Sequence, residues 1–166
     1  MAITRLGGAN AISGIVPVAN GGTGASSFTK GKVLQVVHSS TSTSVSSSNT
    51  TLVDTGLSAS ITPASSSNKV LILVNHGDVD KNGGDTNGRI HLFRDSTFIL
   101  EFARNLNNTG DSTEQRTETG CNFLDSPNTT SATTYKTQFS RNAAGGSFTV
   151  QTSGCTSTIT LMEIEA

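Results

Sequence analysis

The chain has 166 residues, enough for one domain and a short extension, and carries a formal net charge of −1 with only 14% charged residues. This charge balance excludes the basic surface that nucleic-acid-binding proteins and membrane-surface segments need. No apolar run approaches the length of a membrane span, and the first residues lack the apolar core of a signal peptide. We therefore expect a protein that is made in the cytoplasm and has neither nucleic acid nor membrane as its partner.

Serine and threonine dominate the composition. The chain holds 25 Thr and 23 Ser, no Trp and 33% hydrophobic residues. Such a composition has two interpretations: a disordered chain, or a β-rich protein whose strands expose Thr on one face. The β-branched runs described below favour the second.

The first thirteen residues hold apolar positions about three residues apart, with glycines among them. That spacing would suit a short helix, but Gly7 and Gly8 weaken the prediction because glycine is a poor helix former. Two alternatives remain: an anchor that folds on a partner, and a frayed terminus.

Residues 16–28 cannot form a regular helix. A proline lacks an amide donor there, and three glycines follow within four residues. Valines flank the proline and a phenylalanine follows the glycines, so we interpret this stretch as an extended joint ordered against something, not a free linker. Residues 1–31 are therefore predicted to be an attachment arm. Its joint depends on Pro17, Gly21, Gly22, Gly24 and Phe28.

From residue 32 onward, the pattern predicts short strands separated by turn residues. Residues 32–38 indicate the first strand. Residues 39–49 are almost entirely Ser and Thr, which is compatible equally with a loop and with an exposed edge strand. Residues 50–57 and 59–62 indicate two short strands parted by Gly56.

The most hydrophobic run, residues 69–75, is continuous, not alternating. It predicts a central strand buried on both faces, followed by a loop over residues 76–88. Residues 89–94 and 97–103 flank a tight turn at Asp95–Ser96, which is a hairpin signature. The apolar residues predicted to share one face of its second strand are Phe98, Leu100 and Phe102.

Residues 105–113 are predicted to be an exposed loop. The remaining strands are predicted over residues 117–124, 132–140, 147–152 and 158–165. The last of these strands is apolar on both faces. It therefore needs a cover on both sides, supplied by the sandwich and a loop or by a neighbouring subunit.

Many short strands with turn signals and no convincing helix predict an all-β fold. We expect an antiparallel, jelly-roll-like β-sandwich head over residues 32–166, behind the extended glycine-rich arm. Seven Phe, one Tyr and a few aliphatic residues make a thin core for this length. A poor core favours oligomerisation, because subunit contacts bury further apolar surface. Together with the two-sided last strand, it is interpreted as the mark of a homotrimer.

The stretch Asp78-Val79-Asp80-Lys81-Asn82-Gly83 matches the first half of a calcium-binding loop. The position that needs a bidentate Glu is Arg89, whose positive charge opposes a dication. The alternative is a polar loop that uses Asp, Asn and Gly for turn geometry. The second interpretation is favoured, and the sequence predicts no metal and no cofactor.

No catalytic constellation emerges from the sequence. The three histidines lack paired ligand spacing, and Gly31-Lys32 is followed by Val33 where a phosphate-binding loop needs Ser or Thr. No Ser sits in a nucleophile elbow. The glutamates, Glu163 among them, are interpreted as solvated groups and not as a glycosidase pair. We expect no enzyme, with a polysaccharide depolymerase kept as a minor alternative.

Cys121 and Cys155 lie far apart and lack metal-ligand spacing. The favoured interpretation is two buried free thiols. The alternative is a disulfide, which a reducing cytoplasm opposes.

Several segments resemble a known family. Residues 17–26 (PVANGGTGAS) resemble the short repeat of bacteriophage tail-fibre and tail-spike proteins. Further matches to small tail-fibre-like proteins of marine and freshwater phages, including those of cyanobacteria, lie at residues 31–36, 53–57, 124–127, 133–139 and 159–164. The resemblance implies a virion appendage, usually a trimer, assembled in the bacterial cytoplasm. It implies no single role, because such heads sit on fibres, spikes and capsid decorations.

Two functions are therefore considered. The first is a trimeric tail-fibre or tail-spike head that binds a host-surface glycan, because Asn, Ser, Thr and Asp match sugar hydroxyls and several weak sites act together. The second is a capsid decoration or cement protein that clamps other virion proteins through residues 1–31. Tyr135 is predicted either to be a stacking platform for a sugar or to be a core or subunit-contact aromatic. The candidate receptor contacts are Asp78, Asp80, Asn82, Asp85, Asn87, Asn107, Asn108, Asp111 and Tyr135.

Overall fold

The computed structural model describes residues 31–110, 112–142 and 145–166. The predicted joint at Pro17, Gly21, Gly22, Gly24 and Phe28 lies outside these residues, as does Asp111. The described part is built of strands and one short 3-10 turn: β1 (Val33–Thr41), β2 (Val45–Ser47), β3 (Val53–Ile61), β4 (Lys69–Asn82), β5 (Gly88–Arg94), β6 (Thr97–Leu106), β7 (Gln115–Asp125), β8 (Thr133–Arg141), β9 (Ser147–Val150), η2 (Thr152–Gly154) and β10 (Ser157–Ile164).

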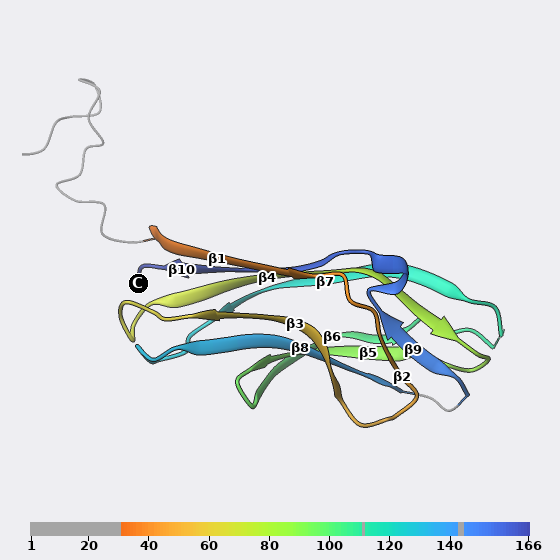
Figure 1. Ribbon diagram of the computed structural model, residues 1–166. Coiled ribbons are helices and arrows are strands. Elements are labelled where there is room, and N and C mark those ends of the chain that lie inside the picture. The colour runs from red at the N-terminus through yellow and green to blue at the C-terminus, as the bar shows by residue number, and fades with distance from the viewer. Residues whose placement is uncertain (1–30, 111, 143–144) are drawn as a thin grey trace, which may run out of the picture.

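The strands form two antiparallel sheets that pack face to face (Figure 1). Sheet A, the upper layer in Figure 1, has the order β1-β10-β4, with β7 on the other edge of β4. Sheet B, the lower layer, has the order β3-β8-β5-β6. The chain crosses between the two layers repeatedly, from β2 to β3, β3 to β4, β4 to β5, β6 to β7, β7 to β8 and β8 to β9, as jelly-roll-like sandwiches do. The predicted all-β, antiparallel, jelly-roll-like sandwich is confirmed.

Strand β4 is longer than the sequence suggested. It was predicted to end at residue 75, with a loop over residues 76–88, but the strand continues to Asn82 because β7 and β9 both pair with its second half. A register shift between His76 and Val79, with Asp78 at φ +47°, lets the strand bend there. Beyond this bend, β2 pairs with β9 and extends sheet A.

Strand β4 is also not buried on both faces. Val70, Ile72 and Val74 are buried against sheet B, whereas Leu71 is partly exposed and Leu73 is 36% exposed. The prediction of two covered faces is therefore wrong for the described residues. The continuous apolar run reflects one inward face and one outward face that are both apolar.

Residues 53–61 form a single strand and not two. Gly56 does not end it: this glycine has φ +81° at a register shift between Asp54 and Ser58. Such a conformation favours glycine because it has no side chain. The strand bulges at this point and pairs with β8 on both sides of the bulge.

The hairpin of β5 and β6 around Asp95 is confirmed. The prediction that Phe98 shares a face with Leu100 and Phe102 is wrong. Leu92 pairs with Leu100 and Phe93 pairs with Phe98, so the register skips Ile99. This bulge leaves Phe98 53% exposed, whereas Leu100 and Phe102 pack against the core.

Two apolar clusters fill the space between the sheets. One is built around Ile72, Tyr135 and Leu161, and the other around Phe139 and Phe148. Phe102 packs against both.

A buried polar group accompanies these clusters. His76 is fully buried and contacts Thr137 Oγ1 at 3.0 Å and Ser157 Oγ at 3.2 Å. Thr55 Oγ1 lies 2.6 Å from the same Thr137 hydroxyl. Burial lowers the pKa of His76 to about 4, so the ring is neutral at pH 7.

Glu163 is buried, not solvated as predicted. Its carboxylate accepts hydrogen bonds from Asn68 Nδ2 at 2.6 Å, Gln35 Nε2 at 2.5 Å and the Ala64 amide at 2.7 Å. Burial acts to raise the pKa of Glu163, but these donors together hold it below its ordinary value. The inward face of β10 therefore ends in a buried, hydrogen-bonded charge.

Cys121 and Cys155 are both free. Cys121 is partly buried, and burial raises the pKa of its thiol to about 11. Cys155 is exposed, so the prediction of two buried thiols is wrong for it. In the part of the chain that the structure describes, no helix is both long and apolar enough to span a membrane.

Candidate functional site

The two loops predicted to contact a receptor meet at one end of the sandwich. The Asp85 amide donates to the Thr109 carbonyl at 3.2 Å, and Asn87 Nδ2 donates to Asn108 Oδ1 at 3.1 Å. Asn107 Nδ2 donates to two backbone carbonyls, at 3.0 and 2.8 Å. Amide groups predicted to bind sugar therefore join the two loops, through Asn87 and Asn108, and tie the second loop to β4 and β7, through Asn107.

The first three predicted contacts, Asp78, Asp80 and Asn82, lie in strand β4 and not in a loop. Asn82 ends the strand and is exposed, as is Asp85 in the loop that follows. The residues that match the first half of a calcium loop, up to Asn82, therefore lie in an extended strand and not in a loop. Within the described ranges, no group of three or more His, Cys, Asp or Glu side chains is placed to hold a metal ion.

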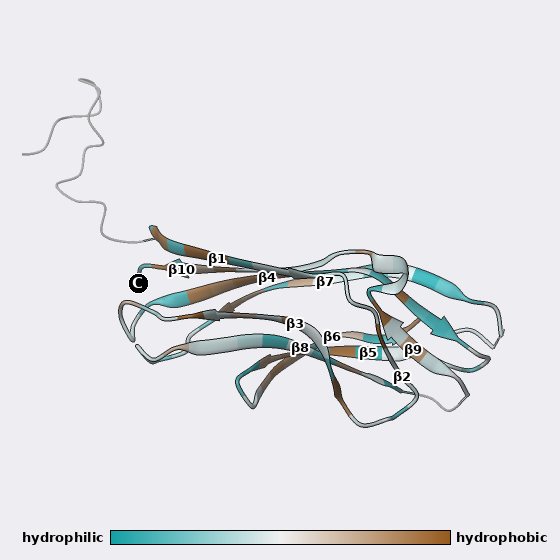
Figure 2. Cartoon of the chain, viewed as in Figure 1, coloured by the Kyte–Doolittle hydropathy of each residue, from teal (hydrophilic) through white to brown (hydrophobic). Residues whose placement is uncertain are grey.

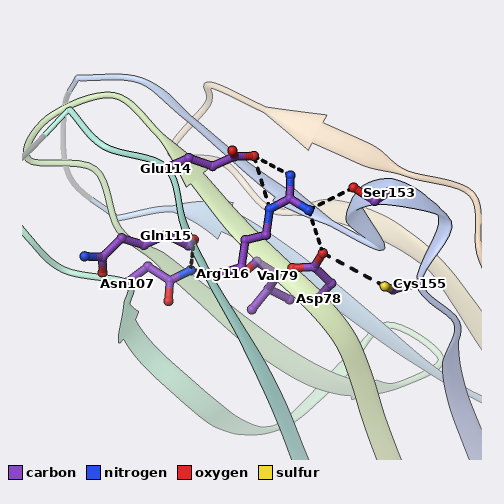
Figure 3. Close-up of polar contacts among 8 residues, drawn as sticks. All are labelled: Asp78, Val79, Asn107, Glu114, Gln115, Arg116, Ser153 and Cys155. Atoms are coloured by element: carbon purple, nitrogen blue, oxygen red, sulfur yellow. Dashed lines mark hydrogen bonds and ion pairs between the residues drawn. The ribbon is translucent and has the colours of Figure 1, made fainter.

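Asp78 belongs to a polar corner centred on Arg116 (Figure 3). The Arg116 guanidinium bonds Glu114 Oε1 at 2.6 Å, Ser153 Oγ at 2.9 Å and Asp78 Oδ2 at 3.2 Å. Cys155 Sγ lies 3.9 Å from the same Asp78 oxygen. A hollow of about 350 Å³ opens here. Its arginine already has three partners of its own, so little donor capacity is left for a ligand.

Asp80 lies beside this corner and is 6% exposed. Burial, followed by the nearby Glu114 carboxylate, raises the pKa of Asp80 to about 6. The surrounding residues cover Asp80, so it offers almost no surface to an outside ligand.

Tyr135 offers no ring face to a sugar. It is fully buried, and its hydroxyl donates to Asp125 Oδ2 at 2.6 Å. Arg94 Nη1 donates to the same oxygen at 2.7 Å. Of the two predicted roles for Tyr135, the structure contradicts the stacking platform and places the ring in the core, where it joins β8 to the end of β7.

The outer face of sheet B presents a different arrangement, which the sequence interpretation missed. On β5 and β8 the inward positions, from Ile90 and Leu92 to Tyr135, Thr137 and Phe139, are fully buried, so the alternate residues His91, Phe93, Lys136 and Gln138 lie on the outer face. Of these, His91 is only 8% exposed. Phe93 pairs with Lys136, and His91 pairs with Gln138. We call this outer face the Phe93–Phe98 surface; it comprises Asp54, His91, Phe93, Phe98, Glu101, Lys136 and Gln138.

An aromatic cluster forms one half of this surface. The rings of Phe93 and Phe98 meet edge to face with centroids 5.9 Å apart, and His91 meets Phe98 in the same way at 5.4 Å. Edge-to-face contact is a favoured geometry for aromatic pairs. The cluster keeps the ring of Phe98, which is more than half exposed, at the surface.

The charged groups of the surface are paired within it. Lys136 Nζ lies 2.9 Å from Asp54 Oδ1, which also accepts from Gln138 Nε2 at 2.7 Å. Glu101 contacts His91 Nε2 at 2.8 Å and Arg104 Nη2 at 3.2 Å. The hydrogen bond from Arg104, aided by His91, holds the pKa of Glu101 below its ordinary value against the effect of burial. The surface is thus polar without an uncompensated charge.

Two hollows adjoin at Lys136. One of about 270 Å³ is lined by Phe93, Asp95, Ser96, Lys136 and Gln138. The other, of about 110 Å³, lies on the side of Asp54 and Gly56. Aromatic edges, an amide, a carboxylate and an ammonium group therefore border the same shallow depression, which is the mixture of apolar and convergent polar groups that ligand sites use.

No protein-family model matches the chain, and no curated protein matches it. Among solved structures, the chain is similar to a structure of infectious bursal disease virus, Gx strain, with 14% identity and a TM-score of 0.49 over 81% of this chain and 33% of that chain. It is also similar to a mutant VP2 protein of the same virus, from derived T=1 particles, with 18% identity and a TM-score of 0.34 over 80% and 36%. The matched part is about a third of each of those chains, and likeness of this degree assigns no function.

Proposed function

We propose that this chain is a virion structural protein of a bacteriophage, the trimeric head of a tail fibre or tail spike, and that it binds a host-surface glycan through the Phe93–Phe98 surface. The phage assignment is supported by the resemblance of residues 17–26 and of the scattered segments that follow. The glycan assignment is carried by one observation: the exposed ring of Phe98 and the partly exposed ring of Phe93 lie beside polar groups whose charges are already compensated.

This combination suits a neutral sugar better than an ionic ligand. A phenylalanine ring packs against the C–H groups of a sugar, while carboxylate, ammonium and amide groups exchange hydrogen bonds with its hydroxyls. An anionic or cationic ligand would have to displace Asp54 from Lys136, or Glu101 from Arg104. Three such surfaces on one trimer, and several trimers on one virion, make weak single sites effective together.

The binding test uses the full chain against a panel of bacterial capsular and lipopolysaccharide glycans. Phe98→Ala is expected to lower binding at least tenfold, because the exposed ring is lost while its core neighbours stay in place. Glu118→Ala is the matched control, since Glu118 is exposed and lines the hollow at Arg116. If Glu118→Ala weakens binding and Phe98→Ala does not, the glycan site lies at the Arg116 corner and not at the Phe93–Phe98 surface.

The position in the virion is tested separately. An antibody to this chain, seen by electron microscopy on intact virions, is expected to label the tail. Label spread over the capsid would overturn the tail assignment in favour of a decoration or cement protein. Release of oligosaccharides from the bound glycan would show instead that the head is a depolymerase.

A further inference from the structure

An uncharged apolar row crosses the outer face of sheet A. Val36 of β1 pairs with Met162 of β10, Met162 pairs with Leu71 of β4, and Leu71 pairs with Leu124 of β7. These four residues therefore stand side by side across four strands, on the face turned away from sheet B. We call the row and its apolar neighbours the apolar band; it comprises Val33, Leu34, Val36, Leu71, Leu73, Leu124, Met162 and Ile164.

The apolar band is open to solvent in the single chain. Val36 is 56% exposed, Leu124 is 48% exposed, and Val33 and Leu34 at the start of β1 are similarly exposed. Figure 2 shows the hydrophobic segments of β1 and β4 in the half of sheet A near the C-terminus. Soluble monomers rarely leave a contiguous apolar face of this kind uncovered, and such faces mark interaction surfaces.

The outward positions of β3 and β8 do not follow this pattern. Outward positions of β3 hold Asp54, Ser58 and Ser60, and outward positions of β8 hold Thr134 and Lys136. A chain with 48 Ser and Thr residues (25 Thr plus 23 Ser) has no shortage of polar side chains for exposed strands. The apolar residues of sheet A therefore require a partner.

The path of the chain indicates which partner. The Gly31 amide donates to the Glu165 carbonyl at 3.0 Å, and Val33 pairs with Ile164, so the described chain begins at the edge of the apolar band. Thirty residues precede this point. Copies that meet through the band would bring their preceding segments together at one end, as a fibre head requires. The four-residue row holds no charge, and the charged Lys69 pairs with Ile164 at the border of the band, so identical copies that meet along the row do so without repulsion between like charges there.

We propose that the apolar band is the surface through which copies of this chain pack against one another in the trimer. This inference rests on the proposed trimeric head, and it adds the surface and the residues that hold the copies together. Its occupant is a second copy of the chain, not the segment of residues 1–30 and not a different protein.

The first experiment measures the mass of the full chain by sedimentation velocity and light scattering. The wild-type chain is expected at three times 17.1 kDa. Val36→Glu combined with Leu124→Glu is expected to give a 17.1 kDa monomer with unchanged far-ultraviolet circular dichroism, since both side chains are half-exposed. Phe98→Glu is the matched control, because Phe98 is 53% exposed on the opposite sheet, and it is expected to stay trimeric.

The second experiment identifies the occupant without destabilising the chain. Leu124 is replaced with a photoreactive benzoylphenylalanine in the full-length protein, and cross-links are mapped by mass spectrometry. Species of twice the chain mass, joined from position 124 to sheet A of another copy, support the proposal. A cross-link within one chain to residues 1–30 overturns it, because the arm would then cover the band.

The outcomes also separate this inference from the proposed function. A trimer that survives both glutamate substitutions, with cross-links elsewhere, overturns the apolar band alone. A monomeric wild-type chain overturns the trimeric head as well. If Phe98→Ala loses glycan binding but stays trimeric, the glycan proposal is supported and the proposal for the apolar band stands independently of it.

Discussion

The outer face of sheet A and the outer face of sheet B follow the same strand alternation yet present different side chains. In sheet A, the outward row of Val36, Met162, Leu71 and Leu124 carries no charge. In sheet B, the outward residues include Lys136 and Gln138, and the charges are paired with partners on the same face. The inward faces of both sheets are buried and mostly apolar, with the buried polar residues His76, Thr137 and Glu163 among them.

This difference separates the positions that the fold constrains from those that contacts with other molecules constrain. Inward positions are set by packing between the sheets, which both layers share. Outward positions are not constrained by the core, so their chemistry reflects what covers them. An uncharged apolar row suits contact with another protein surface, and a face of paired charges with one exposed ring, Phe98, suits a hydrated ligand.

The largest expected effect is the loss of stability when a buried phenylalanine, and not an exposed one, is replaced with alanine. Phe139→Ala removes a fully buried ring and should lower the free energy of unfolding by about 3–5 kcal/mol. Phe98→Ala removes a ring that is 53% exposed and should cost less than about 1 kcal/mol. Urea unfolding of both full-length variants measures the difference. Equal losses would mean that Phe98 is part of the core and that the Phe93–Phe98 surface is not a free face.

A smaller effect concerns the polar group that both sheets cover. The folded-state pKa of His76 is about 4, below its value of about 6.5 in the unfolded chain, so the unfolded state binds more protons between these values. The contribution of His76 to the free energy of unfolding should be fully present above pH 6.5. It should fall by about 3 kcal/mol as the pH drops to 4. Urea midpoints at pH 4.5 and 7.5 measure the loss.

His76→Gln is the companion variant for that measurement. It removes the titrating ring and should give a smaller loss between pH 7.5 and 4.5 than the wild-type chain. If both proteins lose the same stability, other groups cause the pH dependence, and His76 is not the buried neutral ring described above.

The smallest expected effect lies at the polar end of sheet A and has the opposite sign. The pKa of Asp80 is raised to about 6, so the folded state binds more protons than the unfolded state between about pH 4 and 6. Ionised Asp80 therefore opposes folding above pH 6. Asp80→Asn should raise the free energy of unfolding by on the order of 1 kcal/mol at pH 7.5, and the gain should vanish below pH 4. Thermal melts of both proteins at the two pH values measure this. A lower melting temperature for Asp80→Asn than for the wild-type chain at pH 7.5 would contradict the prediction.

Sequence periodicity was sufficient for the sandwich and most of its strands. Strand patterns correctly placed a strand over residues 132–140, and the turn at Asp95 correctly placed the β5–β6 hairpin. These features depend on local patterns that repeat every two residues, so a single sequence carries them.

Bulges account for most of what the sequence did not reveal. A skipped residue at Ile99 turns Phe98 to the outer face, and no local signal marks it. The polar stretch from Asp78 to Asn82 resembled a loop because its strand character comes from pairing with β7 and β9, which lie far along the chain. The Phe93–Phe98 surface was missed for the same reason: its residues come from β3, β5, β6 and β8, and only the sheet order brings them together.

The ladder between β1 and β10 has a mechanical consequence. It runs from the pair Val33–Ile164 to the pair Thr41–Ser157, and its hydrogen bonds lie perpendicular to the strands. A tension applied at Gly31 along the axis of β1 loads these bonds in shear, all at the same time, whereas a sideways pull peels them one after another from Val33. A head tethered at Gly31 should therefore withstand force along its long axis far better than force across it.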